Sequence, residues 1–172
     1  MGKSVIIEAY NPEWAIEFQR EAKKINNIFS EKIIDIEHIG STSVKELGAK
    51  PIIDIMGGVK DLKDVEEFIE PLNQIGYEFV YHKEFPFRRF FRKGQWSAGT
   101  HHLHIYQYQS EHWDNNILFR DYLRNHQDVL EQYYGIKKEL AQKYQFDRKQ
   151  YTSAKAPFIQ NIINKARNEL KV

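Results

Sequence analysis

Residues 36–56 read IEHIGSTSVKELGAKPIIDIM, and this stretch decides the fold. A strand-like apolar segment ends at Gly40, three small hydroxyl residues follow, and a second apolar segment from Pro51 carries one carboxylate, Asp54. A glycine before Ser41 and Thr42 lets the backbone approach a polyphosphate, and the N–H groups of the turn can donate to anionic oxygens. Hard divalent cations bind carboxylates together with substrate phosphates. The pattern therefore predicts a phosphate-binding turn that faces a metal-binding carboxylate.

The composition indicates one domain in which acidic and basic residues are nearly equal in number. The chain has 172 residues, of which 41% are hydrophobic, enough for one sizeable core but not for two. A formal net charge of +1 disfavours binding to long nucleic acids. The absence of cysteine excludes disulfides, thiolate metal sites and cysteine nucleophiles. No apolar stretch reaches the roughly 18 to 20 residues that span a bilayer, so we expect a cytoplasmic protein without a membrane partner.

The spacing of apolar residues predicts an α+β fold. Helical spacing follows the cap Asn11-Pro12 up to about Phe29, and Gly76 is expected to end a second helix that Pro71 would kink or divide. After Ser110 the pattern predicts about three helices. We expect one domain over residues 1–172, with a mixed α/β part at about 1–109 and a helical part at about 110–172. The predicted strands are residues 33–39, 51–56, 77–81, 87–92 and 102–108, and residues 93–100 are predicted to form a long hairpin loop.

Two further patterns could carry chemistry. Because alternate residues of a strand share a face, His102 and His104 point together, and two imidazoles can bind a metal ion or phosphate. A hydrogen-bonded structural role is the alternative for both. Arg88 lies in a basic and aromatic segment, where it can bind phosphate or stay solvated on an edge strand. Tyr151 and Lys155, four residues apart on one helix face, can reach a phosphate together or face water.

Residue spacing argues against three common sites, including a serine nucleophile at Ser41 or Ser43 with His38 or His104 as its base. A serine nucleophile in a Gly-x-Ser-x-Gly elbow would need a second glycine, which the segment after Gly40 lacks. The sequence has neither the Gly-Lys-Ser/Thr ending of a Walker P-loop nor a Gly-x-Gly-x-x-Gly dinucleotide fingerprint. These two nucleotide-binding classes can be set aside.

Three ordered motifs together resemble the GrpB family. They are HIGSTSV at residues 38–44, AKPIIDI at 49–55 and HHLHI at 101–105. The helical tail supports the resemblance, with FRDYLR at 119–124 and the Tyr151/Lys155 pair, so that it covers nearly the whole chain. GrpB proteins are similar to the nucleotidyltransferase superfamily, whose hallmark is Gly-Ser followed by an Asp-x-Asp/Glu pair and a third acid on a later strand. The resemblance implies a nucleotidyltransferase-like mixed sheet with packed helices and a helical C-terminal region.

The sequence matches only part of the superfamily's metal-binding motif. Gly40 and Ser41 match the phosphate-binding turn, and Asp54 matches the first acid. Met56 stands where the second acid is expected, and its thioether is a poor ligand for Mg²⁺. A histidine occupies the strand of the third acid. Four consequences remain open: one ion instead of two, His104 acting as base or ligand, nucleotide binding without transfer, or a metal other than Mg²⁺.

The resulting expectation is a protein that binds a nucleoside triphosphate with Mg²⁺ or Mn²⁺ and transfers a nucleotidyl group to a small-molecule acceptor. One alternative is a non-catalytic nucleotide-binding or interaction module, and another is a His-rich metal-dependent hydrolase. The acceptor, the preferred base and the oligomeric state leave no mark in the sequence. The expected catalytic residues are Asp54 and His104, the metal ligands Asp54, His102 and His104, and the phosphate-binding residues Gly40, Ser41, Thr42, Lys50, Arg88, Tyr151 and Lys155.

Overall fold

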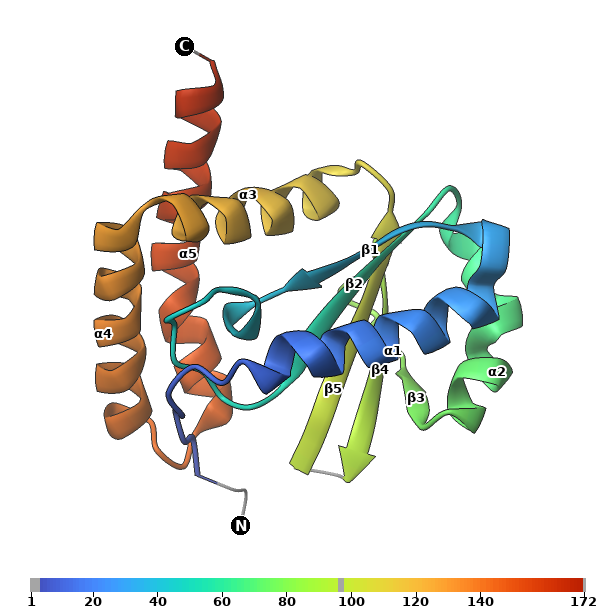
Figure 1. Cartoon of the computed structure of the whole chain (residues 1–172), viewed down its shortest axis with the longest axis horizontal. Coiled ribbons are helices and arrows are strands. Elements are labelled where there is room, and N and C mark those ends of the chain that lie inside the picture. The colour runs from blue at the N-terminus through green and yellow to red at the C-terminus, as the bar shows by residue number, and fades with distance from the viewer. Residues whose placement is uncertain (1–3, 96–97, 172) are drawn as a thin grey trace.

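The structure is a computed structural model that describes residues 4–95 and 98–171. Its centre is a five-stranded sheet with strand order β1-β2-β5-β4-β3. The strands are β1 (Ile33–Ile39), β2 (Ile53–Val59), β3 (Tyr77–Val80), β4 (Arg88–Gln95) and β5 (Ala98–Gln107). The helices are α1 (Glu13–Phe29), α2 (Ile69–Gln74), α3 (Glu111–Asn125), α4 (Gln127–Lys143) and α5 (Arg148–Leu170) (Figure 1). The predicted α+β class and the three C-terminal helices are confirmed.

The sheet is mixed, and one parallel pairing positions the candidate site. Strand β2 pairs antiparallel with β1 but parallel with β5, while β5, β4 and β3 pair antiparallel. In the parallel register Asp54 lies beside His102, and Met56 lies beside His104. Two segments that are far apart in the sequence therefore present their polar side chains on one face of the sheet.

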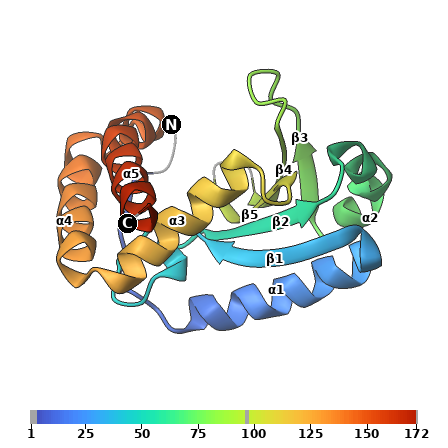
Figure 2. The ribbon, with the colours of Figure 1, turned by 90° about the horizontal axis from the view of Figure 1, so that it is seen from above.

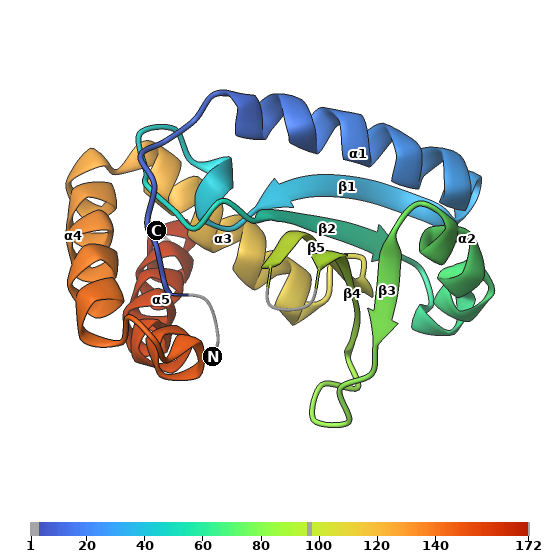
Figure 3. The ribbon, with the colours of Figure 1, turned by 90° about the horizontal axis from the view of Figure 1, so that it is seen from below.

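The helices cover the two faces of the sheet unequally. Helix α1 lies along one face, and α3 crosses the other face from the end where α4 and α5 stand (Figures 2 and 3). The main core lies between α1 and the sheet, where Ile55, Leu103 and Ile105 are fully buried. Since these residues alternate with Asp54, His102 and His104, the polar side chains point to the opposite face.

A second core attaches the helical part to the turn after β1. Val44 and Leu47, which follow Gly40 closely in the chain, are buried among apolar residues of α3, α4 and α5. The three helices thus pack directly on the segment that contains the predicted phosphate-binding turn. None of the helices in the described residues is long and apolar enough to cross a membrane.

One local prediction differs from the structure. Residues 93–100 are not a long loop, because β4 continues to Gln95 and β5 begins at Ala98, with residues 96–97 outside the described part. The second helix, predicted to end at Gly76, is divided into a 3₁₀ segment at Leu62–Phe68 and the short α2. Pro71 lies in the first turn of α2, where its missing N–H costs no helical hydrogen bond, which agrees with the predicted division.

A buried ionic network ties α1 to the far strands. The Glu21 carboxylate is fully buried, pairs with Lys93 of β4 and accepts a hydrogen bond from the Tyr77 hydroxyl at 3.3 Å. Burial alone would raise the pKa of Glu21, but hydrogen bonds from Lys93 and Lys24 hold it below its usual value. The carboxylate is therefore ionised, and its removal leaves the Lys93 ammonium, which is largely buried, without this partner.

We predict that Glu21→Ala lowers the free energy of unfolding by about 3 kcal/mol, since breaking one side of a buried ion pair leaves an uncompensated charge. Glu13→Ala is the matched control on the same helix, because the Glu13 side chain is exposed and its removal should cost at most about 1 kcal/mol. Urea denaturation of both variants measures the difference. Equal losses would contradict the assigned role of the buried network.

Candidate functional site

Gly40 brings the predicted phosphate-binding turn against Asp54. It ends β1 with φ of 72°, a region that side-chain-bearing residues rarely adopt, and the short 3₁₀ turn Ser41–Ser43 follows. A Cβ atom added at Gly40 would lie 2.6 Å from Oδ2 of Asp54. Glycine is thus required twice at this position, for its backbone conformation and for the close approach of the carboxylate.

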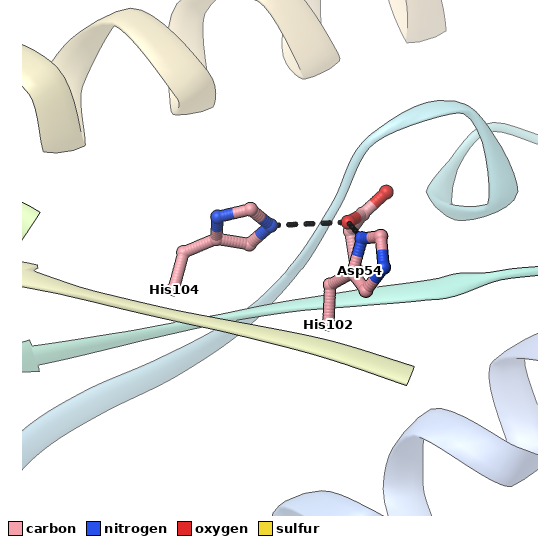
Figure 4. Close-up of side chains that lie close together, drawn as sticks. All are labelled: Asp54, His102 and His104. Atoms are coloured by element: carbon pink, nitrogen blue, oxygen red, sulfur yellow. Dashed lines mark hydrogen bonds and ion pairs between the residues drawn. The ribbon is translucent and has the colours of Figure 1, made fainter. Parts of the chain in front are cut away.

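Asp54 is held by two imidazoles from the neighbouring strand (Figure 4). Nε2 of His104 lies 3.1 Å from Oδ1 of Asp54, and Nδ1 of His102 lies 3.5 Å from the same oxygen. Because a carboxylate only accepts hydrogen bonds, Nε2 of His104 carries the proton and donates it. Nδ1 of His104 is buried and has no hydrogen-bond partner among the described residues. The histidines that the sequence predicts to share a face therefore converge on Asp54.

The electrostatics keep Asp54 ionised and His104 neutral. Burial would raise the pKa of Asp54, but the hydrogen bonds from His102 and His104 hold it well below its usual range. Burial lowers the pKa of His104, although the hydrogen bond to Asp54 partly opposes this. The site at neutral pH is thus a carboxylate with a neutral imidazole, which are the protonation states that metal ligands require.

This group of three side chains fits a divalent metal ion. One ligand atom from each of Asp54, His102 and His104 lies within 4.8 Å of the others. Two imidazole nitrogens and one carboxylate oxygen favour Mn²⁺, Ni²⁺ or Zn²⁺ over Mg²⁺, which prefers oxygen. The position of the missing second acid is occupied by Met56, which is fully buried in an apolar cluster. A second carboxylate there would lie in apolar surroundings, so the described residues support one ion site at Asp54.

Three lysines meet beside Asp54 in a cavity of about 230 Å³, which we call the lysine cavity. The lysines come from three segments: Lys50 precedes β2, Lys137 lies on α4 and Lys155 on α5. The cavity therefore forms only when the helical part packs on the turn after β1. Its lining includes Ser41, Thr42, Lys50, Asp54, His102, Lys137, Tyr151 and Lys155.

The lysines are desolvated and close enough to repel one another. Lys137 is 2% exposed, and its Nζ donates to the carbonyl of Gly48 at 2.7 Å. Burial, and then the positive charge of Lys50, lowers the pKa of Lys155 to about 8. Burial also lowers the pKa of Lys137, followed by the charges of Lys155 and Lys50. Among the described lining residues Asp54 is the only carboxylate, so an anion would relieve this repulsion.

Tyr151 contributes an unpartnered hydroxyl to the same cavity. Its side chain is fully buried, and no described residue forms a hydrogen bond with its hydroxyl oxygen. Nζ of Lys155 lies 4.5 Å from the centre of the Tyr151 ring, and Nζ of Lys50 lies 5.3 Å from it. A buried hydroxyl without a partner costs free energy, which a bound acceptor such as a phosphate oxygen would offset.

The structure brings together all the predicted site residues except Arg88. The Arg88 guanidinium lies over the rings of Phe85 and Phe90 and hydrogen-bonds with Nδ1 of His82 at 3.2 Å. It does not line the lysine cavity, so its predicted phosphate contact has no support in this geometry. Lys137 is a cavity residue that was not among the predicted ones. The sequence pattern that could have indicated it is a lysine at a core-facing position of α4, in line with Leu130, Tyr133 and Ala141.

Comparisons with known proteins agree with the motifs. Residues 4–165 match the family model described as GrpB protein. The chain is 38% identical to the glutamate-rich protein GrpB of Alkalihalophilus pseudofirmus over 93% of its own length and 94% of the relative. The chain belongs to the GrpB family. It is also 35% identical to YqkA of Bacillus subtilis, covering 96% of this chain but only 48% of that relative.

Solved structures place the GrpB fold among the nucleotidyltransferase-like folds. The crystal structure of conserved protein GrpB from Enterococcus faecalis matches with a TM-score of 0.90 and 35% identity, over 97% of this chain and 100% of that one. Cid1 in complex with the UTP analogue UMPNPP matches with a TM-score of 0.55 and 12% identity, over 79% of this chain and 43% of Cid1. At this identity the likeness to Cid1 establishes the fold alone.

We predict that Gly40→Ala lowers the free energy of unfolding by about 1 to 3 kcal/mol, because alanine disfavours a positive φ and its Cβ collides with Asp54. Gly135→Ala is the control, since it lies inside α4 with no atom within 4 Å of an added Cβ, and it should stabilise by about 0.5 to 1 kcal/mol. Chemical denaturation measures both. Stabilisation by Gly40→Ala would show that the turn does not need glycine.

Proposed function

We propose that this GrpB protein binds a nucleoside triphosphate, with its phosphates in the lysine cavity and a divalent ion at Asp54, His102 and His104. The convergence of Lys50, Lys137 and Lys155 on one cavity beside Asp54 carries the proposal. Desolvated cations that repel one another are stabilised by a polyanion, and the unpartnered Tyr151 hydroxyl supplies a further hydrogen-bond donor. The UTP analogue in the Cid1 structure is consistent with this assignment.

The same geometry supports transfer of a nucleotidyl group to a small acceptor. The lysines neutralise the phosphates, and the turn at Gly40 and Ser41 fixes their position beside Asp54. A divalent ion bound at Asp54 would stabilise charge on the transferred phosphoryl group and the leaving pyrophosphate. His104 could hold that ion through Nε2 in the tautomer that carries its proton on Nδ1, and in that tautomer Nε2 could instead accept a proton from the acceptor hydroxyl.

Two other functions each have an observation in their favour. The apolar cluster around Met56 favours a protein that binds a nucleotide without transferring part of it, since the second acid position is occupied by packed side chains. The two imidazoles at Asp54 favour a metal-dependent hydrolase that retains Zn²⁺ or Mn²⁺ through purification. Metal content and metal-dependent nucleotide affinity separate these functions.

We predict that ATP binds at least about tenfold more tightly with Mn²⁺ than with EDTA, and that Asp54→Ala removes this difference, because it removes the carboxylate that holds the ion. Asp128→Ala, an exposed acid on α4, should leave it unchanged. Isothermal titration calorimetry measures the affinities, with ATP, GTP, CTP and UTP compared in turn.

Other results of this titration would change the assignment. ATP affinity that depends on neither metal nor Asp54 contradicts the metal-dependent transferase and favours the binding module. Stoichiometric zinc or manganese in the purified protein, found by elemental analysis together with hydrolysis of ATP, favours the hydrolase. No ATP binding under any condition refutes the nucleotide site itself.

We predict that ATP affinity decreases as the pH rises through about 8, the pKa of Lys155, because the ammonium that pairs with phosphate loses its proton. Lys155→Arg should give a flatter pH profile, since the guanidinium stays charged. Lys155→Met should weaken binding about tenfold or more at pH 7, where the ammonium is present. ATP affinity of the wild type that stays constant between pH 7 and 9 would contradict a phosphate contact for Lys155.

A further inference from the structure

The lysine cavity is too small to enclose a complete nucleotide. Its volume of about 230 Å³ is below the roughly 300 to 1,000 Å³ typical of sites for whole small-molecule ligands. A polyphosphate bound there must therefore extend its nucleoside into another region. A second cavity, of about 540 Å³, adjoins the first, and Lys50 and Ile52 line both. We call it the apolar cavity.

The apolar cavity differs from the lysine cavity in its chemistry. Its walls include Ile6, Pro51, Ile52 and Ala98, and it contains the carboxylate-bearing residue Glu8. Apolar walls with few polar groups suit a planar base and a sugar, whereas a carboxylate repels phosphate. The two adjoining cavities thus match the two halves of a nucleotide, with Lys50 at their boundary.

Two residues of the apolar cavity have apolar surface that the described residues leave uncovered or a donor that they leave without a hydrogen bond. Ile6 is 61% exposed although it is large and apolar, and it faces this cavity instead of a core. Nε of Arg148 is buried and forms no hydrogen bond with the described residues. Apolar surface that a ligand would cover and a buried donor that a ligand would satisfy are both typical of a binding site.

We infer that the apolar cavity holds the nucleoside of a nucleotide whose phosphates lie in the lysine cavity. Ile6 and Ile52 contact the base or sugar, and Arg148 donates from Nε to one of its oxygen or nitrogen acceptors. Lys50 contacts the phosphate nearest the sugar, because it lines both cavities. This inference rests on the proposed nucleotide site and adds the residues that read the nucleoside.

The test compares ATP with inorganic tripolyphosphate, which has the phosphates without the nucleoside. Calorimetric titrations with Mn²⁺ should show that wild-type protein binds ATP more tightly than tripolyphosphate. Ile6→Ser should weaken ATP about tenfold and leave tripolyphosphate unchanged, because it removes apolar contact surface without adding a charge. Ile16→Ser, at a 45% exposed isoleucine of α1 outside both cavities, is the matched control and should change neither affinity.

Each outcome of this comparison is decisive. Equal affinity of the wild type for ATP and tripolyphosphate, or ATP binding that Ile6→Ser leaves intact, overturns the nucleoside assignment while the phosphate site stands. Failure of both ligands to bind wild-type protein refutes the proposed nucleotide site, and the nucleoside assignment with it. Retained tripolyphosphate binding by Ile6→Ser also shows that the variant is folded.

Discussion

The close approach of Gly40 to the Asp54 carboxylate is the constraint on which the site depends. It fixes the end of β1 against the beginning of β2, with no room for a Cβ atom between turn and carboxylate. The parallel pairing of β2 with β5 then places His102 beside Asp54 and His104 one alternate position further. Any change that opens this contact would separate the turn at residues 40–43 from Asp54 and its two histidines, so the proposed site requires glycine at this position.

The helical part depends on the same segment. Val44 and Leu47 leave the turn and are buried among α3, α4 and α5, which carries Lys137 and Lys155 to the cavity beside Asp54. Arg124 strengthens this junction, because its guanidinium donates to the carbonyl of Ser43 at 2.7 Å. Burial lowers the pKa values of Lys137 and Lys155. Packing of the second core holds both side chains in this buried position. Ionisable groups with shifted pKa values are often found at functional sites.

The sequence predicted the parts of the site that follow from local pattern. The turn at Gly40, the acid in a buried strand and the shared face of His102 and His104 all follow from residue type and the strand period of two. Lys50 and Lys155 were among the predicted residues, but Lys137 was not, since it reaches the cavity only through packing of α4 against the segment before β2. Arg88 lies on a strand, as predicted, but its guanidinium packs over the rings of Phe85 and Phe90 and not along the lysine cavity. Residue spacing alone does not predict this packing.

Met56 determines what kind of chemistry this fold can support. In a two-metal site the second acid shares the ion with the first, but here the corresponding position packs with Ile39, Tyr106 and Trp113. An acid in that cluster would need its own partner to stay ionised. In the proposed site, the charge that a second ion would neutralise is balanced by the three lysines that line the same cavity as Asp54. If the proposed ion site at Asp54 binds one ion, the positive charge of Lys50, Lys137 and Lys155 would take over part of the charge stabilisation that a second metal ion supplies elsewhere.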